Sequence, residues 1–213
     1  MWLLGLRSNL PNGRRFAAGG NVDSEVGLRR LRRRMKSQMK MVSRPRPSVR
    51  DPRRHLLAAV FAFVRDARSI PGVRRIALIG SLTTDKPVPK DADVLLTIDA
   101  AMKLAPLARL GRRLKGTGNS INLSADTFLV DQNDRYMGRI CRYRECHPRV
   151  ACLARHCGGR EHLNDDLDVV TLGASLIAKP PIELWPRIVR RVAVPADTEA
   201  LLVAELEKDE LLQ

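Results

Sequence analysis

The chain has 213 residues, of which 44% are hydrophobic and only 4% are aromatic. This length suits one domain of ordinary size whose core is mainly aliphatic. No apolar run approaches the roughly 20 residues that a membrane-spanning helix needs. The opening stretch MWLLGLRSNLPNG is too short and too poor in apolar residues for a secretory signal. We therefore expect a cytoplasmic protein with no membrane partner.

The formal net charge is +15, and most of it lies near the N-terminus. Residues 1–54 hold fifteen of the 38 Lys and Arg residues but only three of the 23 Asp and Glu residues. We predict that residues 1–50 form a basic arm, disordered because it has little apolar surface to bury. Such an arm can contact nucleic acid by releasing counterions from phosphates. The alternatives are a solvated extension, or upstream sequence included through a misplaced start codon.

The folded domain is predicted to cover residues 51–213. It opens with a helix, in which Asp51 is the expected N-cap and Pro52 the first helical residue. The apolar residues of this segment recur at spacings of three and four, as on one face of an amphipathic helix.

The segments that follow alternate between short apolar runs and longer periodic stretches. We predict strands over 74–80 and 91–99, a helix over 100–116 interrupted by Pro106, and strands over 120–131 and 135–143. Two apolar stretches, 166–178 and 183–194, precede a C-terminal helix over 195–212 that Asp197 or Thr198 caps. This order predicts an α/β (α+β) fold: a small mixed β-sheet with flanking helices.

The segment IALIGSLTTDKPVPKDADVLLTID (76–99) carries the clearest chemistry. Gly80 permits a tight turn after the first strand, and Ser81 with the following backbone N–H groups outlines a phosphate cradle. Asp91 and Asp93 flank one residue of an extended chain, so both side chains lie on one face. Two carboxylates that close repel each other unless a cation offsets the repulsion.

A third acid, Asp126, lies inside the otherwise apolar strand over 120–131 and therefore needs a partner. If this strand lies beside the one that follows Asp93, the three carboxylates form a triad. Oxygen ligands of this kind favour Mg²⁺.

These residues resemble the DNA polymerase beta-like nucleotidyltransferase superfamily, and most closely its minimal bacterial domains. The match consists of LIGS, nine residues, DAD, the apolar run VLLTI and the later Asp126, and it covers about residues 55–131. The resemblance implies transfer of a nucleoside monophosphate from an NTP, ATP first among them, to a hydroxyl-type acceptor. The acceptor is a small molecule, a protein or an RNA.

The resemblance also implies roles for the individual residues. Gly80 and Ser81 hold the terminal phosphates. Asp91, Asp93 and Asp126 are the catalytic residues and bind two Mg²⁺ ions, which stabilise the entering and leaving oxygens. Many family members have a serine before the first acid, where this chain has Lys90. We assign Lys90 to nucleotide binding, the alternative being an altered pocket.

The Cys/His-rich segment over 135–162 contains the four cysteines, Cys141, Cys146, Cys152 and Cys157. In a cytosolic protein such clustering favours zinc over disulfides. We expect a structural Zn²⁺ held by the four thiolates, or by three of them and a histidine. The alternative is four cysteines without a metal.

The sequence thus predicts a Mg²⁺-dependent nucleotidyltransferase. The alternative is a catalytically inert protein with the same core, either zinc-stapled and nucleic-acid-binding or an interaction protein of the toxin–antitoxin type.

Overall fold

In a computed structural model of the chain, residues 51–141, 160–164, 167 and 170–212 are described. They belong to a compact unit formed by Arg46–Gln213. The predicted basic arm over 1–50 lies outside the described residues, as do Cys146, Cys152 and Cys157.

The first helix, α2 (Pro52–Ala67), begins where the sequence predicts. The Asp51 carboxylate accepts a hydrogen bond from the Arg54 backbone N–H at 3.0 Å, and Pro52 lies in the first turn. This N-cap satisfies one of the backbone donors that a helix start leaves unpaired. One face of α2 is buried, including Leu56, Val60 and Val64.

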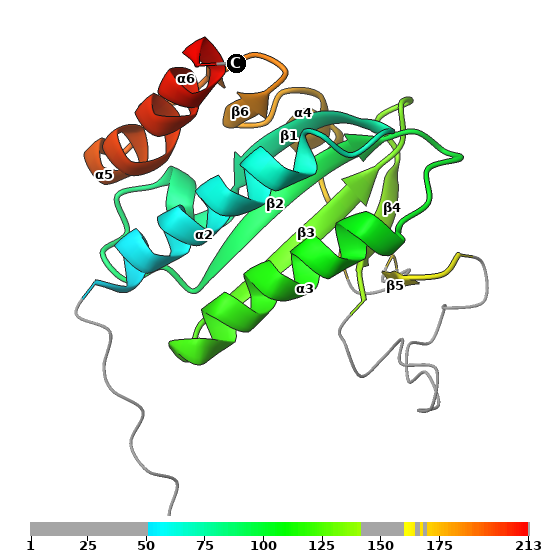
Figure 1. The fold of residues 1–213 in the computed structure, drawn as a ribbon, viewed down its shortest axis with the longest axis horizontal. Coiled ribbons are helices and arrows are strands. Elements are labelled where there is room, and N and C mark those ends of the chain that lie inside the picture. Colours follow the sequence, from blue (N-terminus) through cyan, green and yellow to red (C-terminus); the bar gives the residue numbers. More distant parts are fainter. Residues whose placement is uncertain (1–50, 142–159, 165–166, 168–169, 213) are drawn as a thin grey trace, which may run out of the picture. The chain divides into compact units, whose positions relative to one another are not determined.

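A seven-stranded mixed sheet runs through the unit in the order β5-β4-β3-β2-β1-β6-β7 (Figure 1). The pair β2–β3 is parallel, and every other neighbouring pair is antiparallel. The strands are β1 (Val73–Ile79), β2 (Asp91–Ile98), β3 (Ser124–Val130), β4 (Tyr136–Ile140), β5 (Leu163–Asn164), β6 (Ile182–Trp185) and β7 (Val189–Arg190).

The parallel pair is joined by α3 (Ala105–Ser120), as a crossover between parallel strands requires. The predicted interruption at Pro106 is wrong: Pro106 lies in the first turn, where its missing N–H costs no hydrogen bond. Near the other end, a Cβ on Gly118 would lie 2.8 Å from the Ser124 backbone. The glycine therefore lets the end of α3 approach the start of β3 closely.

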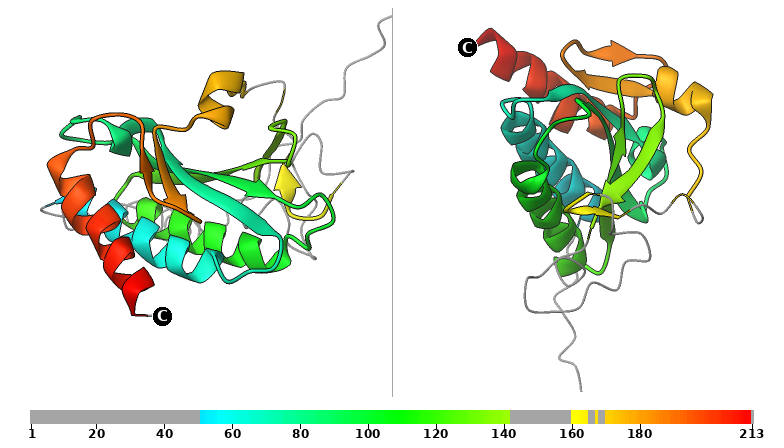
Figure 2. Two further views of the ribbon diagram at one scale, coloured as in Figure 1. Left: turned by 90° about the horizontal axis from the view of Figure 1, so that it is seen from above. Right: turned by 90° about the vertical axis from the view of Figure 1, so that its right-hand side faces the viewer.

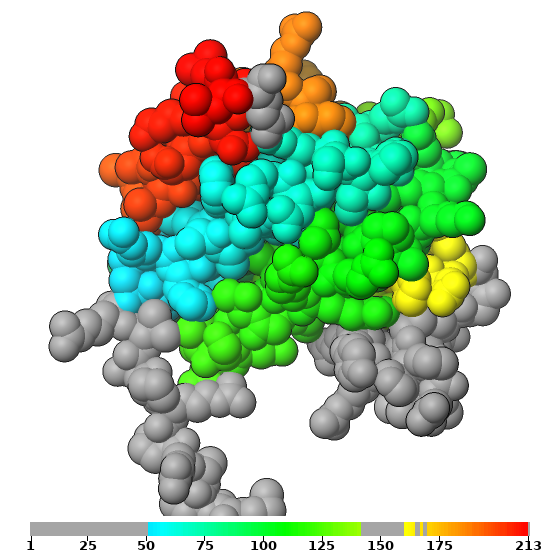
Figure 3. All heavy atoms as spheres, viewed as in Figure 1, coloured from blue at the N-terminus to red at the C-terminus, as the bar shows by residue number. Residues whose placement is uncertain are grey.

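Helices α2 and α3 cover one face of the sheet (Figure 2). The space-filling view shows them side by side, with the C-terminal helical segment beyond α2 (Figure 3). Between helices and sheet lies the main core, which takes alternate residues of β2 and β3: Ala92, Val94, Leu96, Ala125 and Leu129. The side chains between them in sequence, including Asp91, Asp93 and Asp126, belong to the opposite face.

That opposite face has a smaller apolar cluster. Leu95 and Val130 pack there with Ile177 of the short helix α4 (Ala174–Ala178). The cluster also includes Ile79, the register partner of Asp93, so apolar side chains reach the neighbourhood of the carboxylates.

The C-terminal helical segment consists of α5 (Ala196–Thr198), the π-helical turn η3 (Glu199–Val203) and α6 (Ala204–Leu211). The predicted side-chain cap is wrong, because Pro195 is the N-cap residue and makes no capping hydrogen bond. Asp197 and Thr198 instead bond the buried Arg53 of α2, at 2.5 and 3.0 Å. These contacts fix the segment against α2.

The coarse prediction of an α/β fold with a mixed sheet and flanking helices is confirmed. In the described part of the chain, no helix has both the length and the apolar character needed to cross a membrane.

Candidate active site

The three predicted carboxylates come from the starts of two neighbouring strands. Asp93 of β2 is the direct register partner of Asp126 of β3, and Asp91 is paired with Ser124. Because β2 and β3 are parallel and in register, Asp91, Asp93 and Asp126 all lie on the sheet face opposite α2 and α3. The structure thus brings the three acids together.

The Gly-Ser turn lies on the other side of β2. Ile79, the last residue of β1, is the register partner of Asp93, and the 3₁₀ turn η1 (Gly80–Thr83) follows directly. Gly80 has a positive φ of 73°, and a Cβ at this position would collide with the Asp93 carboxylate. Glycine is therefore required here both by the backbone conformation and by the approach of the carboxylate.

Ser81 connects this turn to the first acid. Its hydroxyl donates to the Asp91 backbone carbonyl at 2.9 Å and lies 3.4 Å from Asp91 Oδ1. The turn is closed by Thr83, whose hydroxyl donates to the Gly80 carbonyl at 2.8 Å. Ser81 thus has a fixed place beside the carboxylates, and Gly80 is exposed to solvent.

The surroundings of Asp93 disfavour its ionised form. Burial, the negative charges of Asp91 and Asp126, and hydrogen bonding to Asp91 raise the pKa of Asp93 to about 7, which Lys115 lowers only in part. Burial and the neighbouring negative charges therefore favour a proton on Asp93 over a further ionised carboxylate. A divalent cation held by Asp91 and Asp93 would relieve the same repulsion.

Lys115 of α3 occupies part of this site. Its ammonium donates to Asp126 Oδ1 at 2.7 Å, to Ser124 Oγ at 3.2 Å and to the Ala125 carbonyl at 3.2 Å. Only 16% of the Lys115 side chain and 23% of the Asp126 side chain are exposed, so this ion pair is shielded from solvent. Asp126 therefore has a partner, as an acid in an apolar strand requires, but the partner is a lysine.

Among the described residues, no three His, Cys, Asp or Glu side chains are arranged so that they could hold one metal ion together. Asp91 and Asp93 supply two carboxylates from β2, while the Asp126 carboxylate forms an ion pair with Lys115. Lys90 immediately precedes the first acid and is exposed, with its backbone carbonyl 3.4 Å from the Ser124 N–H.

Arg53 holds the chain that follows the Gly-Ser turn. It is 7% exposed, and its guanidinium donates to the carbonyls of Thr84 at 2.9 Å and Lys86 at 3.0 Å. The same group forms an ion pair with Asp197 at 2.5 Å. One arginine therefore ties α2, the segment after Ser81 and the C-terminal helical segment to each other.

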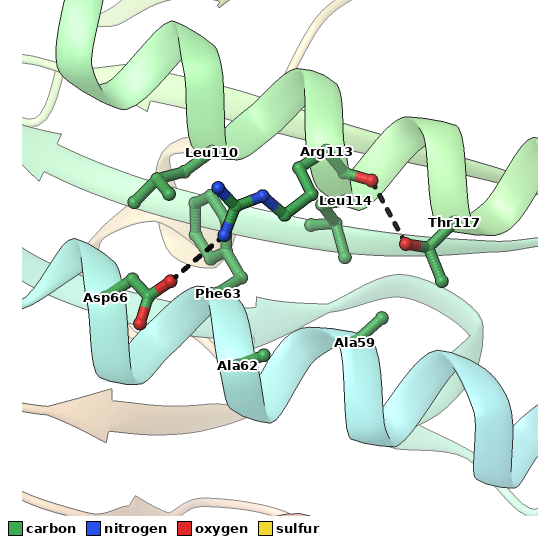
Figure 4. Close-up of a pocket in the computed structure, with 8 residues that line it drawn as sticks. All are labelled: Ala59, Ala62, Phe63, Asp66, Leu110, Arg113, Leu114 and Thr117. Atoms are coloured by element: carbon green, nitrogen blue, oxygen red, sulfur yellow. Dashed lines mark hydrogen bonds and ion pairs between the residues drawn. The ribbon is translucent and has the colours of Figure 1, made fainter.

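A groove between α2 and α3 is not a candidate for the nucleotide (Figure 4). It lies on the helical side of the sheet, where Ala59 and Ala62 face Leu114. Arg113 of α3 reaches across the groove and forms an ion pair with Asp66 of α2 at 3.4 Å. Its volume of about 60 Å³ is far below the several hundred Å³ of a usual ligand pocket.

Of the four predicted zinc ligands, only Cys141 is described. It is 1% exposed, and its sulfur accepts a hydrogen bond from Arg112 at 3.1 Å. The same guanidinium nitrogen lies 3.1 Å from His162 Nδ1. Burial and the charge of Arg112 lower the pKa of His162, and nearby Glu161 opposes the shift. Whether the four cysteines converge stays a prediction.

Fold and site together define a mixed α/β protein with a shielded carboxylate cluster at the start of two parallel strands. A comparison with protein-family models found no matching family. Comparisons with curated proteins and with solved structures found no match either. The nucleotidyltransferase reading therefore rests on the residues and their geometry alone.

Sequence reasoning missed Lys115 and Arg53. Both lie in helices, where a basic residue usually marks a solvated face. The one available signal for Lys115 was Asp126 itself, because a carboxylate in an apolar strand requires a partner. Nothing in the sequence indicates which of the many basic residues that partner is.

Proposed function

We propose that the chain is a nucleotidyltransferase that moves a nucleoside monophosphate from an NTP to a hydroxyl-type acceptor. The observation that carries the proposal is the convergence of Asp91, Asp93 and Asp126 beside the Gly80–Ser81 turn. Burial and the neighbouring acids raise the pKa of Asp93 to about 7, and acids perturbed in this way are common at sites that bind cations or move protons.

The residues divide the work as follows. The N–H groups of η1 and the Ser81 hydroxyl bind the terminal phosphates, and Lys90 adds a positive charge from the solvent side. Gly80 leaves room for Asp93 and for the phosphates. Asp91 and Asp93 hold Mg²⁺, which supplies charge stabilisation at the reacting phosphate when bound.

The reaction forms a bond between the acceptor oxygen and the α-phosphorus and breaks the bond to the bridging oxygen, so pyrophosphate leaves. The acceptor's hydroxyl proton passes to a carboxylate of the cluster. Asp126 Oδ2, the oxygen outside the 2.7 Å bond to Lys115, is suited to receive it.

The test is incubation of the purified protein with each of the four NTPs, labelled at the α-phosphate, with Mg²⁺ and a cell lysate. We expect one NTP to label an acceptor and to release pyrophosphate, and Asp91→Asn to do neither. Failure of every NTP to label anything, or equal labelling by the Asn variant, would overturn the proposal.

A second candidate is an inert interaction protein with the same core. The observation in its favour is the ion pair between Lys115 and Asp126, because this salt bridge occupies one of the three carboxylates that a metal ion would use. In that case we expect RNA or DNA binding through residues 1–50 that weakens steeply with salt, and no nucleotide transfer.

A further inference from the structure

The carboxylate cluster contains an ion pair between Lys115 and Asp126, so a positive charge is already present in the proposed metal site. We propose that Lys115 is a built-in cation that takes the place of one of the two metal ions. The site then binds a single divalent cation through Asp91 and Asp93. This inference rests on the proposed function. It assigns to the site one lysine and one metal ion, where the sequence predicts two metal ions.

Lys115 is positioned where a second cation of the cluster would lie. The ammonium of Lys115 lies 2.7 Å from Asp126 Oδ1, and Asp126 is paired across the sheet with Asp93. A positive charge is thus already in place on the β3 side of the cluster. A second divalent ion on that side would be repelled by the ammonium unless the lysine moved away.

Lys115 is also held in place by hydrogen bonds. Besides Asp126, it donates to Ser124 Oγ and to the Ala125 carbonyl, each at 3.2 Å, so three acceptors match its three protons. Gly118, one turn further along α3, allows the close approach to Ser124 that brings the lysine within reach. A lysine with three acceptors in a shielded site does not exchange readily with a hydrated ion.

Charge is divided unevenly between the two strands of the cluster. Lys115 forms its ion pair with Asp126 at 2.7 Å, on the β3 side of the cluster. Because Lys115 supplies one positive charge for three acids, the two acids of β2 are left without a neutralising charge from Lys115. A single divalent cation at Asp91 and Asp93 would complete the balance.

Mn²⁺ titration followed by electron paramagnetic resonance tests the proposal, because the signal of free Mn²⁺ counts the bound ions without any assay of activity. We expect one Mn²⁺ per wild-type chain. Lys115→Gln keeps a hydrogen-bond donor but removes the charge, so it should bind a second ion, or bind the first about tenfold more tightly. Lys115→Arg should behave like the wild type.

Arg113→Met is the matched control. It removes one positive charge from the same helix, but the Arg113 side chain is 73% exposed and pairs with Asp66. We expect it to leave Mn²⁺ binding within twofold of the wild type. Equal ion numbers and affinities in Lys115→Gln and the wild type, including no binding in either, would overturn the inference.

Two further outcomes separate this inference from the proposed function. Nucleotide transfer by a wild-type chain that binds two Mn²⁺ ions would leave the function standing and refute the role of Lys115. An extra ion in Lys115→Gln, in a protein that transfers no nucleotide, would do the reverse. If Lys115→Gln and Lys115→Met both fail to fold with or without Mn²⁺, the lysine is structural and the inference falls.

Discussion

Asp93 and Asp126 face each other as register partners on adjacent parallel strands, and within the described part of the chain only Asp126 forms an ion pair. Lys115 bonds Asp126 directly, whereas Asp93 lies between two other acids. This asymmetry explains why the pKa of Asp93 rises to about 7, chiefly through burial and then through Asp91 and Asp126. Several measurable properties of the protein depend on it.

The first prediction concerns stability as a function of pH. Because the pKa of Asp93 is raised in the folded state, the stability that its proton contributes is complete below about pH 4 and is lost as pH rises through about 7. Asp93→Asn has no charge to bury. It should therefore be more stable than the wild type at pH 8, by at most about 4 kcal/mol, with the advantage shrinking toward pH 4.

Urea unfolding at pH 4 to 8 measures this difference, with Asp85→Asn at an exposed position as the control. Added Mg²⁺ should narrow the difference at pH 8, because it stabilises the ionised wild-type cluster. A difference that stays constant with pH, or an Asn variant that is less stable at pH 8, would contradict the assignment.

The second prediction concerns catalysis. Under the proposed function, Asp91→Asn and Asp93→Asn should each reduce pyrophosphate release from the NTP by at least about 100-fold, because each removes a charge that would hold the metal. Circular dichroism should show both variants folded. Asp85→Asn should retain the wild-type rate, since Asp85 is exposed and separate from the cluster. A comparable loss of pyrophosphate release in all three variants would contradict a specific role of Asp91 and Asp93 in catalysis.

The third prediction concerns Gly80. Gly80→Ala forces a Cβ onto a residue with φ of 73° and against the Asp93 carboxylate, so it should cost about 1–3 kcal/mol of stability. Gly116→Ala is the contrasting variant. Its Cβ would meet nothing within 4 Å in α3, and it should gain about 0.5–1 kcal/mol. Thermal and urea unfolding of both variants would show opposite signs.

The fourth prediction concerns Arg53. Arg53→Met leaves the carbonyls of Thr84 and Lys86 without their donor and removes the ion pair to the partly exposed Asp197, which should cost about 1–3 kcal/mol. Hydrogen exchange should also quicken in residues 82–86. Arg65→Met, in the same helix with a half-exposed side chain, should cost about 0.5 kcal/mol or less. Equal costs would show that the burial of Arg53 contributes nothing.

The fifth prediction concerns zinc. Metal analysis of protein purified without chelators should find about one zinc per chain, and Cys141→Ser should lower that number. The hydrogen bond from Arg112 to the Cys141 sulfur would support a thiolate at this position. Protein that is folded and free of zinc would leave Cys141 as a buried thiol.

The local part of the structure was predictable because local rules govern it. Asp51 and Pro52 specify the start of α2 through capping and a fixed φ. Apolar runs bounded by turn residues predicted β1 to β4, and the alternation of Asp91 and Asp93 placed both acids on one face. At Pro106 the sequence was misread, because the same residue that breaks a helix interior is well suited to a first turn.

The tertiary structure decided which distant groups meet. The sequence determined that Asp126 needs a partner, and it suggested a metal. The partner in the fold is Lys115, because the crossover between parallel strands lays α3 along β3, and Gly118 allows close contact where β3 begins. Likewise, Arg53 meets Asp197 across 144 positions of sequence. Pairings of this kind depend on strand order and helix packing, which no local pattern encodes.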